Sequence, residues 1–169
     1  MRKLVEAIKA GDLVKVHKLI ISDRSSIKEA TGTRVLSEAV KEDSMEIVSL
    51  LIELGAEVND EDRVIYDNET PLAIAASKGN LEMVKFIINA GAVVNIPLKD
   101  PEYWTPLMCA VSSGNLNIVK LLVEAGADVN EIRDGGNFPL AIASNNGYSE
   151  IFNYLAPLTN IELRQQLEN

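Results

Sequence analysis

The sequence has few of the residues from which catalytic centres, disulfide-bonded domains and nucleic-acid-binding surfaces are built. It contains one cysteine and one histidine, and aromatic residues make up 5% of its 169 positions. The single cysteine, Cys109, permits no internal disulfide, so we expect a reducing compartment, the cytoplasm. The formal net charge of −9 argues against a nucleic-acid partner, because binding to phosphates needs a basic surface.

Long apolar runs are also missing. No segment is long and apolar enough for a membrane span, and the N-terminal MRKLVEAIKAGD lacks the unbroken apolar stretch of a signal peptide. Hydrophobic residues nevertheless make up 47% of the chain, so Leu, Ile, Val and Ala must form the core. Such a core favours packed helices over a β-sandwich, which uses more aromatic and β-branched residues.

Two segments of the chain, 70–95 and 105–130, repeat one another without a gap. They read TPLAIAASKGNLEMVKFIINAGAVVN and TPLMCAVSSGNLNIVKLLVEAGADVN, and weaker copies lie at 4–21, 34–59 and 138–158. The five copies share a turn position, occupied by Gly11, Asp43, Gly79, Gly114 and Gly147, at spacings of 32, 36, 35 and 33 residues. A period of roughly 33 residues that begins with Thr-Pro-Leu is typical of ankyrin repeats.

On these motifs the chain resembles an ankyrin-repeat protein over nearly its whole length. The resemblance implies an all-α solenoid of about five stacked helix-turn-helix repeats with β-hairpin-like fingers between them. It implies a single domain, 1–169, with repeats at about 1–32, 33–68, 69–103, 104–136 and 137–158, and a C-terminal capping helix at 159–169.

Local signals predict where the helices begin. Thr70 and Thr105 are expected N-caps, each followed by proline at the first helical position. Arg34 and Phe138 stand where these copies have the capping threonine. In the tail, Thr159 and Glu162 fit a capping box, with Leu158 and Leu163 spaced as a hydrophobic staple, so we expect the tail to cover the open end of the stack.

The residues with reactive side chains are too far apart for catalysis. His17, in the first copy, and Cys109, in the fourth, lie three repeats apart and cannot converge on a catalytic or zinc site. Cys109 aligns with isoleucines and is expected in the core, whereas His17 aligns with polar residues and is expected on the surface. The acidic run at 59–63 lacks the spacing of a calcium loop. We therefore expect no enzyme, no metal and no cofactor.

The segments that join the repeats, here called fingers, differ in length. The interval to the next motif is eleven residues after Asn59, ten after Asn95 and eight after Asn130. We interpret these three asparagines as structural residues whose amides bind the hairpin backbone. Four of the eight aromatic residues fall in the fingers, namely Tyr66, Tyr103, Trp104 and Phe138. Aromatic anchors ringed by polar groups favour a protein interface, although Tyr103 and Trp104 packed between fingers would only stiffen them.

In ankyrin-repeat proteins the finger residues before each motif and the ends of the first helices form a concave binding surface. The resemblance therefore implies that a partner protein binds two groups of residues. The finger residues are Tyr66, Asp67, Glu69, Glu102, Tyr103, Trp104, Gly135 and Asn137, and the helix-end residues are Lys41, Glu42, Ser77, Lys78, Ser112, Ser113, Asn145 and Asn146. We expect the indole of Trp104 to be exposed in the groove, so that its removal weakens binding and leaves stability nearly unchanged.

Charge gives a further expectation about the partner. Residues 1–45 carry nine Lys and Arg against seven Asp and Glu, whereas residues 46–169 carry seven against eighteen. The finger carboxylates would steer a partner that has a basic patch, or would act only as solubilising charges. They are Asp60, Glu61, Asp62, Asp67, Glu69, Asp100 and Glu102.

Together these observations predict a protein–protein interaction module, an adaptor or an inhibitor. Two alternatives stay open. One is a scaffold or homo-oligomer that assembles through the end caps. The other is a small enzyme, which the lack of converging reactive residues disfavours.

Overall fold

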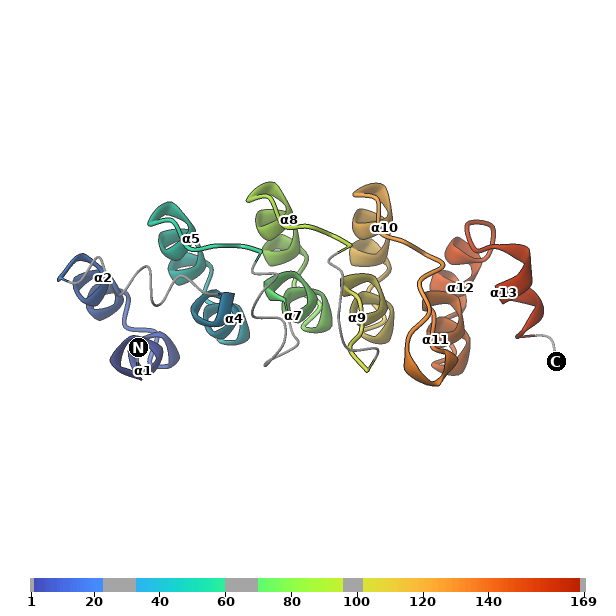
Figure 1. The fold of residues 1–169 in the computed structure, drawn as a ribbon, viewed down its shortest axis with the longest axis horizontal. Helices are drawn as coiled ribbons and strands as arrows, with labels where there is room; N and C mark the ends of the chain where they lie inside the picture. The colour runs from blue at the N-terminus through green and yellow to red at the C-terminus, as the bar shows by residue number, and fades with distance from the viewer. Residues whose placement is uncertain (1, 23–32, 60–69, 96–101, 168–169) are drawn as a thin grey trace.

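The structure, a computed structural model, describes residues 2–22, 33–59, 70–95 and 102–167. These segments form a solenoid of paired helices, with the first helices of the pairs in one row and the second helices in another (Figure 1). The predicted all-α repeat fold is confirmed. In the described segments there is no strand, and only an isolated β-bridge joins Arg133 to Asn137.

Five pairs and a terminal helix make up the described part of the solenoid. The first helices are α1 (Arg2–Lys9), α4 (Thr33–Lys41), α7 (Pro71–Ser77), α9 (Pro106–Ser112) and α11 (Pro139–Asn145). The second helices are α2 (Leu13–Ser22), α5 (Met45–Glu53), α8 (Leu81–Asn89), α10 (Leu116–Glu124) and α12 (Ser149–Leu155). A 3-10 turn, η1 (Asp134–Gly136), precedes α11, and the short α13 (Ile161–Gln165) ends the array.

Side-chain caps fix the starts of the central helices. The hydroxyl oxygen of Thr70 accepts a hydrogen bond from the backbone N–H of Ala73 at 3.1 Å, and Thr105 caps α9 in the same way. Both predicted N-caps are therefore confirmed. Asn80 and Asn115 cap α8 and α10, which the sequence signals above do not predict.

The turn between the two helices of a pair needs a left-handed residue. Glycine holds it in four pairs, and Asp43, with φ of 58°, holds it in the second; no other non-glycine among the described residues has a positive φ. Aspartate tolerates this conformation better than most residues. Its carboxylate also accepts a hydrogen bond from Asn80 Nδ2 of the next pair at 2.7 Å. The alignment of Asp43 with the turn glycines is therefore confirmed.

The first helices form the centre of the core. Residues 71–76 of α7 are all buried, because α7 packs between α4 and α9. Ala73, Ala75 and Ala76 allow the neighbouring helices to approach closely, while Leu72 and Ile74 fill the space between them. Burying a side chain of that size stabilises the fold by roughly 1.5–3 kcal/mol. The second helices bury only one face, for example Met83, Val84 and Ile87 of α8.

The amides of the repeat-ending asparagines link consecutive pairs. Asn59 Nδ2 donates to the carbonyl of Gly91 at 2.7 Å, and Asn59 Oδ1 accepts from Val93 N at 2.8 Å. Asn95 makes the same two bonds to Gly126 and Asp128. The residues are structural, as predicted, and the backbone that they bind belongs to the following repeat.

Two helix starts differ from the expected pattern. Helix α4 begins at Thr33, so Arg34 lies inside its first turn and does not occupy the capping position. Phe138 occupies the N-cap position of α11 without a side-chain cap bond, and it is 2% exposed. Phe138 therefore provides no capping hydrogen bond and instead packs in the apolar core.

The predicted capping box of the tail is wrong. The N-cap of α13 is Asn160, whose side chain accepts from Leu163 N at 2.9 Å. Thr159 is buried, and its hydroxyl donates to the carbonyl of Leu155 at 3.0 Å, because the turn that closes α12 continues through it. Leu158 is 45% exposed and forms no staple. Leu163 is buried in the core, so the tail does cover the end of the stack.

Candidate functional site

The helix-end residues lie along one edge of the solenoid. They occupy the last turns of α4, α7, α9 and α11, and each of these helices packs against the next. All are exposed except Ser112, which is half-buried; the set, here called the helix-end row, is Lys41, Ser77, Lys78, Ser112, Ser113, Asn145 and Asn146. Because the preceding turns are buried, the last turn is where these helices present polar groups to solvent. Consecutive repeats therefore bring the predicted helix-end residues together as a polar row.

The two long fingers are described only in part. Tyr66, Asp67 and Glu69 lie outside the described residues, as do all of the steering carboxylates except Glu102. In the second finger Glu102 is exposed, while Tyr103 and Trp104 are half-buried.

The position of Trp104 corrects one expectation. The sequence predicts an exposed indole, but Trp104 is half-buried and packs against the hydrophobic core. An aromatic side chain in that position contributes buried apolar area. Replacement of Trp104 is therefore expected to lower stability, contrary to the expectation of an unchanged melting temperature.

The third finger is a tight turn before α11. Arg133 N donates to the carbonyl of Asn137 at 2.8 Å, and Gly135 and Gly136 both have positive φ, which glycine adopts without strain. Asn137 Nδ2 donates to the carbonyl of Asp134 at 2.7 Å. The amide of Asn137 therefore holds the turn, which limits what it can offer to a partner.

Reactive groups do not converge in the described part of the chain. His17 is exposed on α2 and Cys109 is half-buried on α9, and no cluster of three or more His, Cys, Asp or Glu side chains suited to a metal occurs among the described residues. Burial, and secondarily the Glu124 carboxylate, raise the pKa of Tyr154 above its usual 10.0. The neutral ring lies 5.6 Å from Lys120 Nζ, a cation–π contact between α12 and α10.

Among the helices that the structure describes, none is both long and apolar enough to cross a membrane.

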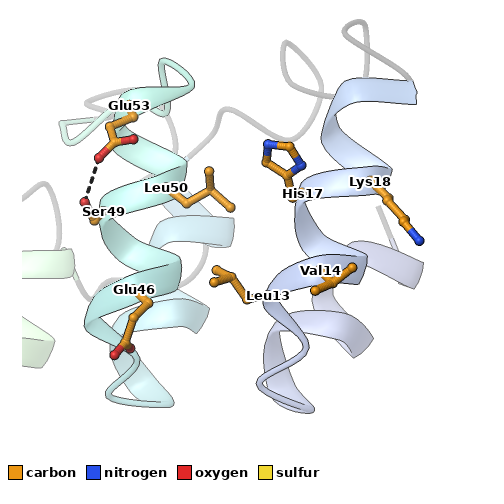
Figure 2. Close-up of a pocket in the computed structure, with 8 residues that line it drawn as sticks. All are labelled: Leu13, Val14, His17, Lys18, Glu46, Ser49, Leu50 and Glu53. Carbon is orange, nitrogen blue, oxygen red and sulfur yellow. Dashed lines mark hydrogen bonds between the residues drawn. The ribbon is translucent and has the colours of Figure 1, made fainter.

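A groove on the opposite face was not predicted. It lies between the second helices α2 and α5 and has a volume of about 400 Å³. Figure 2 shows Leu13 and His17 of α2 pointing toward α5, and Leu50 of α5 pointing toward α2. Glu46 and Glu53 lie along the α5 side, where Glu53 accepts a hydrogen bond from the Ser49 hydroxyl at 3.0 Å (Figure 2). The groove therefore has an apolar floor and an acidic border.

Comparison with known proteins agrees with the fold. The family model described as ankyrin repeats (three copies) matches residues 4–97 and 94–166. The chain therefore belongs to the ankyrin-repeat family. Ankyrin repeats are protein–protein interaction modules whose stacked units present extended binding surfaces.

Three curated relatives illustrate the range of proteins in which such repeats occur. Human protein phosphatase 1 regulatory subunit 27 is 41% identical over 90 residues, which is 52% of this chain and 56% of the relative. The ankyrin repeat and KH domain-containing protein mask-1 of Caenorhabditis elegans is 33% identical over 59% of this chain and 4% of its own length. The BRCA1-associated RING domain protein 1 of the same species is 33% identical over 43% and 10%. The matches thus span between 4% and 56% of the length of these relatives.

Proposed function

We propose that this chain works by binding a partner protein, as an adaptor or an inhibitor, and not by catalysis. The observation that carries the proposal is the helix-end row, a continuous set of polar side chains on four consecutive first helices. Polar groups held at fixed repeat spacing by buried helices lose little entropy when they bind a partner. The aromatic residues of the second finger would supply the apolar anchor beside this row.

The similarity to a regulatory subunit of protein phosphatase 1 suggests the first partner to test, which is protein phosphatase 1 itself. The acidic finger residues favour a partner that has a basic patch. The single cysteine fits a reducing compartment, and we place the interaction in the cytoplasm.

Substitutions in the helix-end row test the binding surface. Ser77→Arg and Asn145→Arg place bulky cations at exposed positions, so we expect each to weaken binding of the partner about tenfold without lowering stability. Asn117→Arg, at an exposed position of α10, is the control and should bind normally. The measurement is titration calorimetry with purified protein phosphatase 1, or with the partner recovered from a native lysate. Normal binding by both row variants, with loss in the control, would place the interface on the other face.

Trp104→Ala tests the finger anchor. We expect partner binding to weaken by about 2 kcal/mol, the scale of an interface hot spot. Because the indole packs against the core, binding must be compared at a temperature where circular dichroism shows that the variant is folded. A folded variant that binds like the wild type would show that Trp104 only stiffens the finger.

A further inference from the structure

The turn that joins α11 to α12 contains the one asparagine of the chain that precedes a glycine. The pair is Asn146-Gly147, and every other asparagine except the C-terminal one is followed by a residue that has a Cβ atom. A Cβ atom hinders the approach of another group to the backbone nitrogen of its own residue, whereas glycine leaves that nitrogen accessible. The surroundings of Gly147 are also open, because a Cβ built on it would meet nothing within 4 Å.

The side chain of Asn146 is exposed, and no hydrogen bond joins it to any residue that the structure describes. Other asparagines use their side chains to cap helices, to hold a turn or to link repeats. They are Asn59, Asn80, Asn95, Asn115, Asn130, Asn137 and Asn160. Asn146 therefore carries an amide that the fold does not use.

An exposed amide beside an accessible backbone nitrogen can lose ammonia. The nitrogen of Gly147 attacks Cγ of Asn146, so a bond forms between these two atoms and the Cγ–Nδ2 bond breaks. Nδ2 leaves as ammonia and takes the proton of the Gly147 amide. Water then opens the five-membered imide, which leaves aspartate or isoaspartate at position 146. Water is the only co-reactant, and a neutral amide is replaced by a carboxylate.

We propose that Asn146 is a modification site of this kind and that the native turn controls its rate. Asn146 has φ of −88° and ψ of −5°, and Gly147 N donates to the carbonyl of Ser144 at 3.1 Å. In the imide ring Gly147 N is nearly eclipsed with Cβ of Asn146, so ψ must rotate by roughly 120°, the angle between substituents of a tetrahedral Cα. This rotation breaks the hydrogen bond to Ser144. The folded turn is therefore unreactive, and the reaction proceeds when the turn opens.

The turn lies in the last pair of the array. Helices α11 and α12 pack against α9 and α10 on one side, and the short α13 lies beside α12 on the other (Figure 1). Each unit of a repeat array is stabilised by its neighbours, so a terminal pair opens at a lower free energy than an internal pair. The modification therefore records opening of the fifth pair. Its carboxylate lies at the C-terminal end of α11, where the helix dipole disfavours negative charge. The inference does not depend on what the helix-end row binds.

Mass spectrometry of the full chain during incubation at physiological temperature and pH tests the proposal. We expect a slow mass gain, that of an amide replaced by a carboxylate, and peptide mapping should place the first gain at Asn146. Asn146→Ser gives the fifth turn the residue that the fourth turn has at Ser113, so it should remove this gain without loss of thermal stability. In concentrated urea the gain of the wild type should be about tenfold faster, because the turn is open.

Two variants of the tail test the control by the turn. Leu163→Ala removes a buried side chain of α13, and the milder Asn160→Ala removes its N-cap, so each should accelerate the gain severalfold in the folded protein. Ile20→Ala, at a buried position of α2 in the first pair, is the matched control for lost core volume and should leave the rate unchanged. Circular dichroism shows that each variant is folded during the incubation.

Four outcomes overturn the proposal. The first is a folded wild type that gains no mass, and the second is a first gain at another asparagine. The third is a rate in the folded protein equal to that in urea, because the turn would then give no protection. The fourth is an equal acceleration by Ile20→Ala, which would show that the turn opens only when the whole chain unfolds.

Discussion

In the third, fourth and fifth pairs the residue after the left-handed turn position contacts the preceding repeat. Asn80 donates to Asp43, and Asn115 Nδ2 donates to the carbonyl of Gly79 at 3.2 Å. In the fifth pair a tyrosine takes this place. The hydroxyl of Tyr148 makes a long hydrogen bond of 3.4 Å to the carbonyl of Ser112, and its ring lies against Gly114. The turn glycine Gly79 therefore contacts an asparagine amide of the next repeat, whereas the equivalent Gly114 contacts an aromatic ring.

Gly114→Ala and Gly147→Ala separate backbone strain from this packing. Both glycines have φ of 71°, so alanine at either position should cost about 1 kcal/mol of folding free energy. A Cβ at Gly114 would lie 3.1 Å from Tyr148 Cζ, whereas a Cβ at Gly147 would meet nothing within 4 Å. We therefore expect Gly114→Ala to lose about 1 kcal/mol more, the low end of overpacking, in urea unfolding.

Tyr148→Asn supplies the control, because asparagine occupies this position in two other repeats. In that background the two alanine variants should be equally stable. A difference that persists without the tyrosine ring would place the extra cost in the backbone.

At the scale of elements, Asn59, Asn95 and Asn130 link successive repeats, and they are here called the asparagine ladder. Asn59 and Asn95 each bridge to the next repeat with two hydrogen bonds, while Asn130 Oδ1 accepts one bond, from Asn160 N at 2.8 Å. Side-chain pairs such as Lys9 with Glu38, at 3.4 Å, also join neighbouring first helices, but they are partly exposed. Exposed ion pairs contribute little, so the ladder is the stronger polar link.

The ladder predicts a graded loss of stability. Asn59→Ala and Asn95→Ala should each lose about 2 kcal/mol, and Asn130→Ala about 1 kcal/mol, because a typical hydrogen bond contributes about 1 kcal/mol net. Chemical denaturation measures the three differences. Asn89→Ala, at an exposed position of α8, should be nearly neutral. Equal losses at all three ladder positions would show that the number of bonds does not set the cost.

At the scale of the whole molecule, the two ends of the chain differ in charge, and the two rows of helices carry different surface features. Residues 1–53, up to the end of α5, carry nine basic and nine acidic residues, and the remainder of the chain is acidic. The helix-end row lies on the first helices, whereas the α2–α5 groove lies on the second helices. A partner bound along the helix-end row would therefore leave the groove open.

The salt dependence of the association rate should show whether the finger carboxylates attract a partner, as the sequence predicts. If the finger carboxylates attract a partner that has a basic patch, the association rate should fall severalfold from low to physiological salt while the dissociation rate changes little. Stopped-flow or surface-plasmon measurements separate the two rates. Neutralising Asp100 and Glu102 should reduce the salt dependence, and neutralising Glu82 and Glu150, which are exposed on second helices, should not. A rate that is independent of salt would leave the carboxylates only a solubilising role.

The sequence by itself determined the repeat, the helix pairs and the local turn chemistry of this protein. Thr70, Thr105 and the left-handed Asp43 could be predicted because a cap or a tight turn depends on residues within a few positions along the chain. The helix-end residues could be placed on one edge for a similar reason, since a regular repeat returns each position to the same place.

The contacts and the burial that each residue gains from the neighbouring repeat were set only by the tertiary structure. It placed Thr159 in the turn that follows α12 instead of at a helix cap, packed Trp104 against the core, and directed the asparagine amides to the backbone of the next repeat. It also left Val14 and Ile21 of α2 exposed beside a groove. Whether a side chain is buried depends on which repeat stacks against it. The residues that make such a contact lie about one repeat apart in the sequence, so no local pattern predicts it.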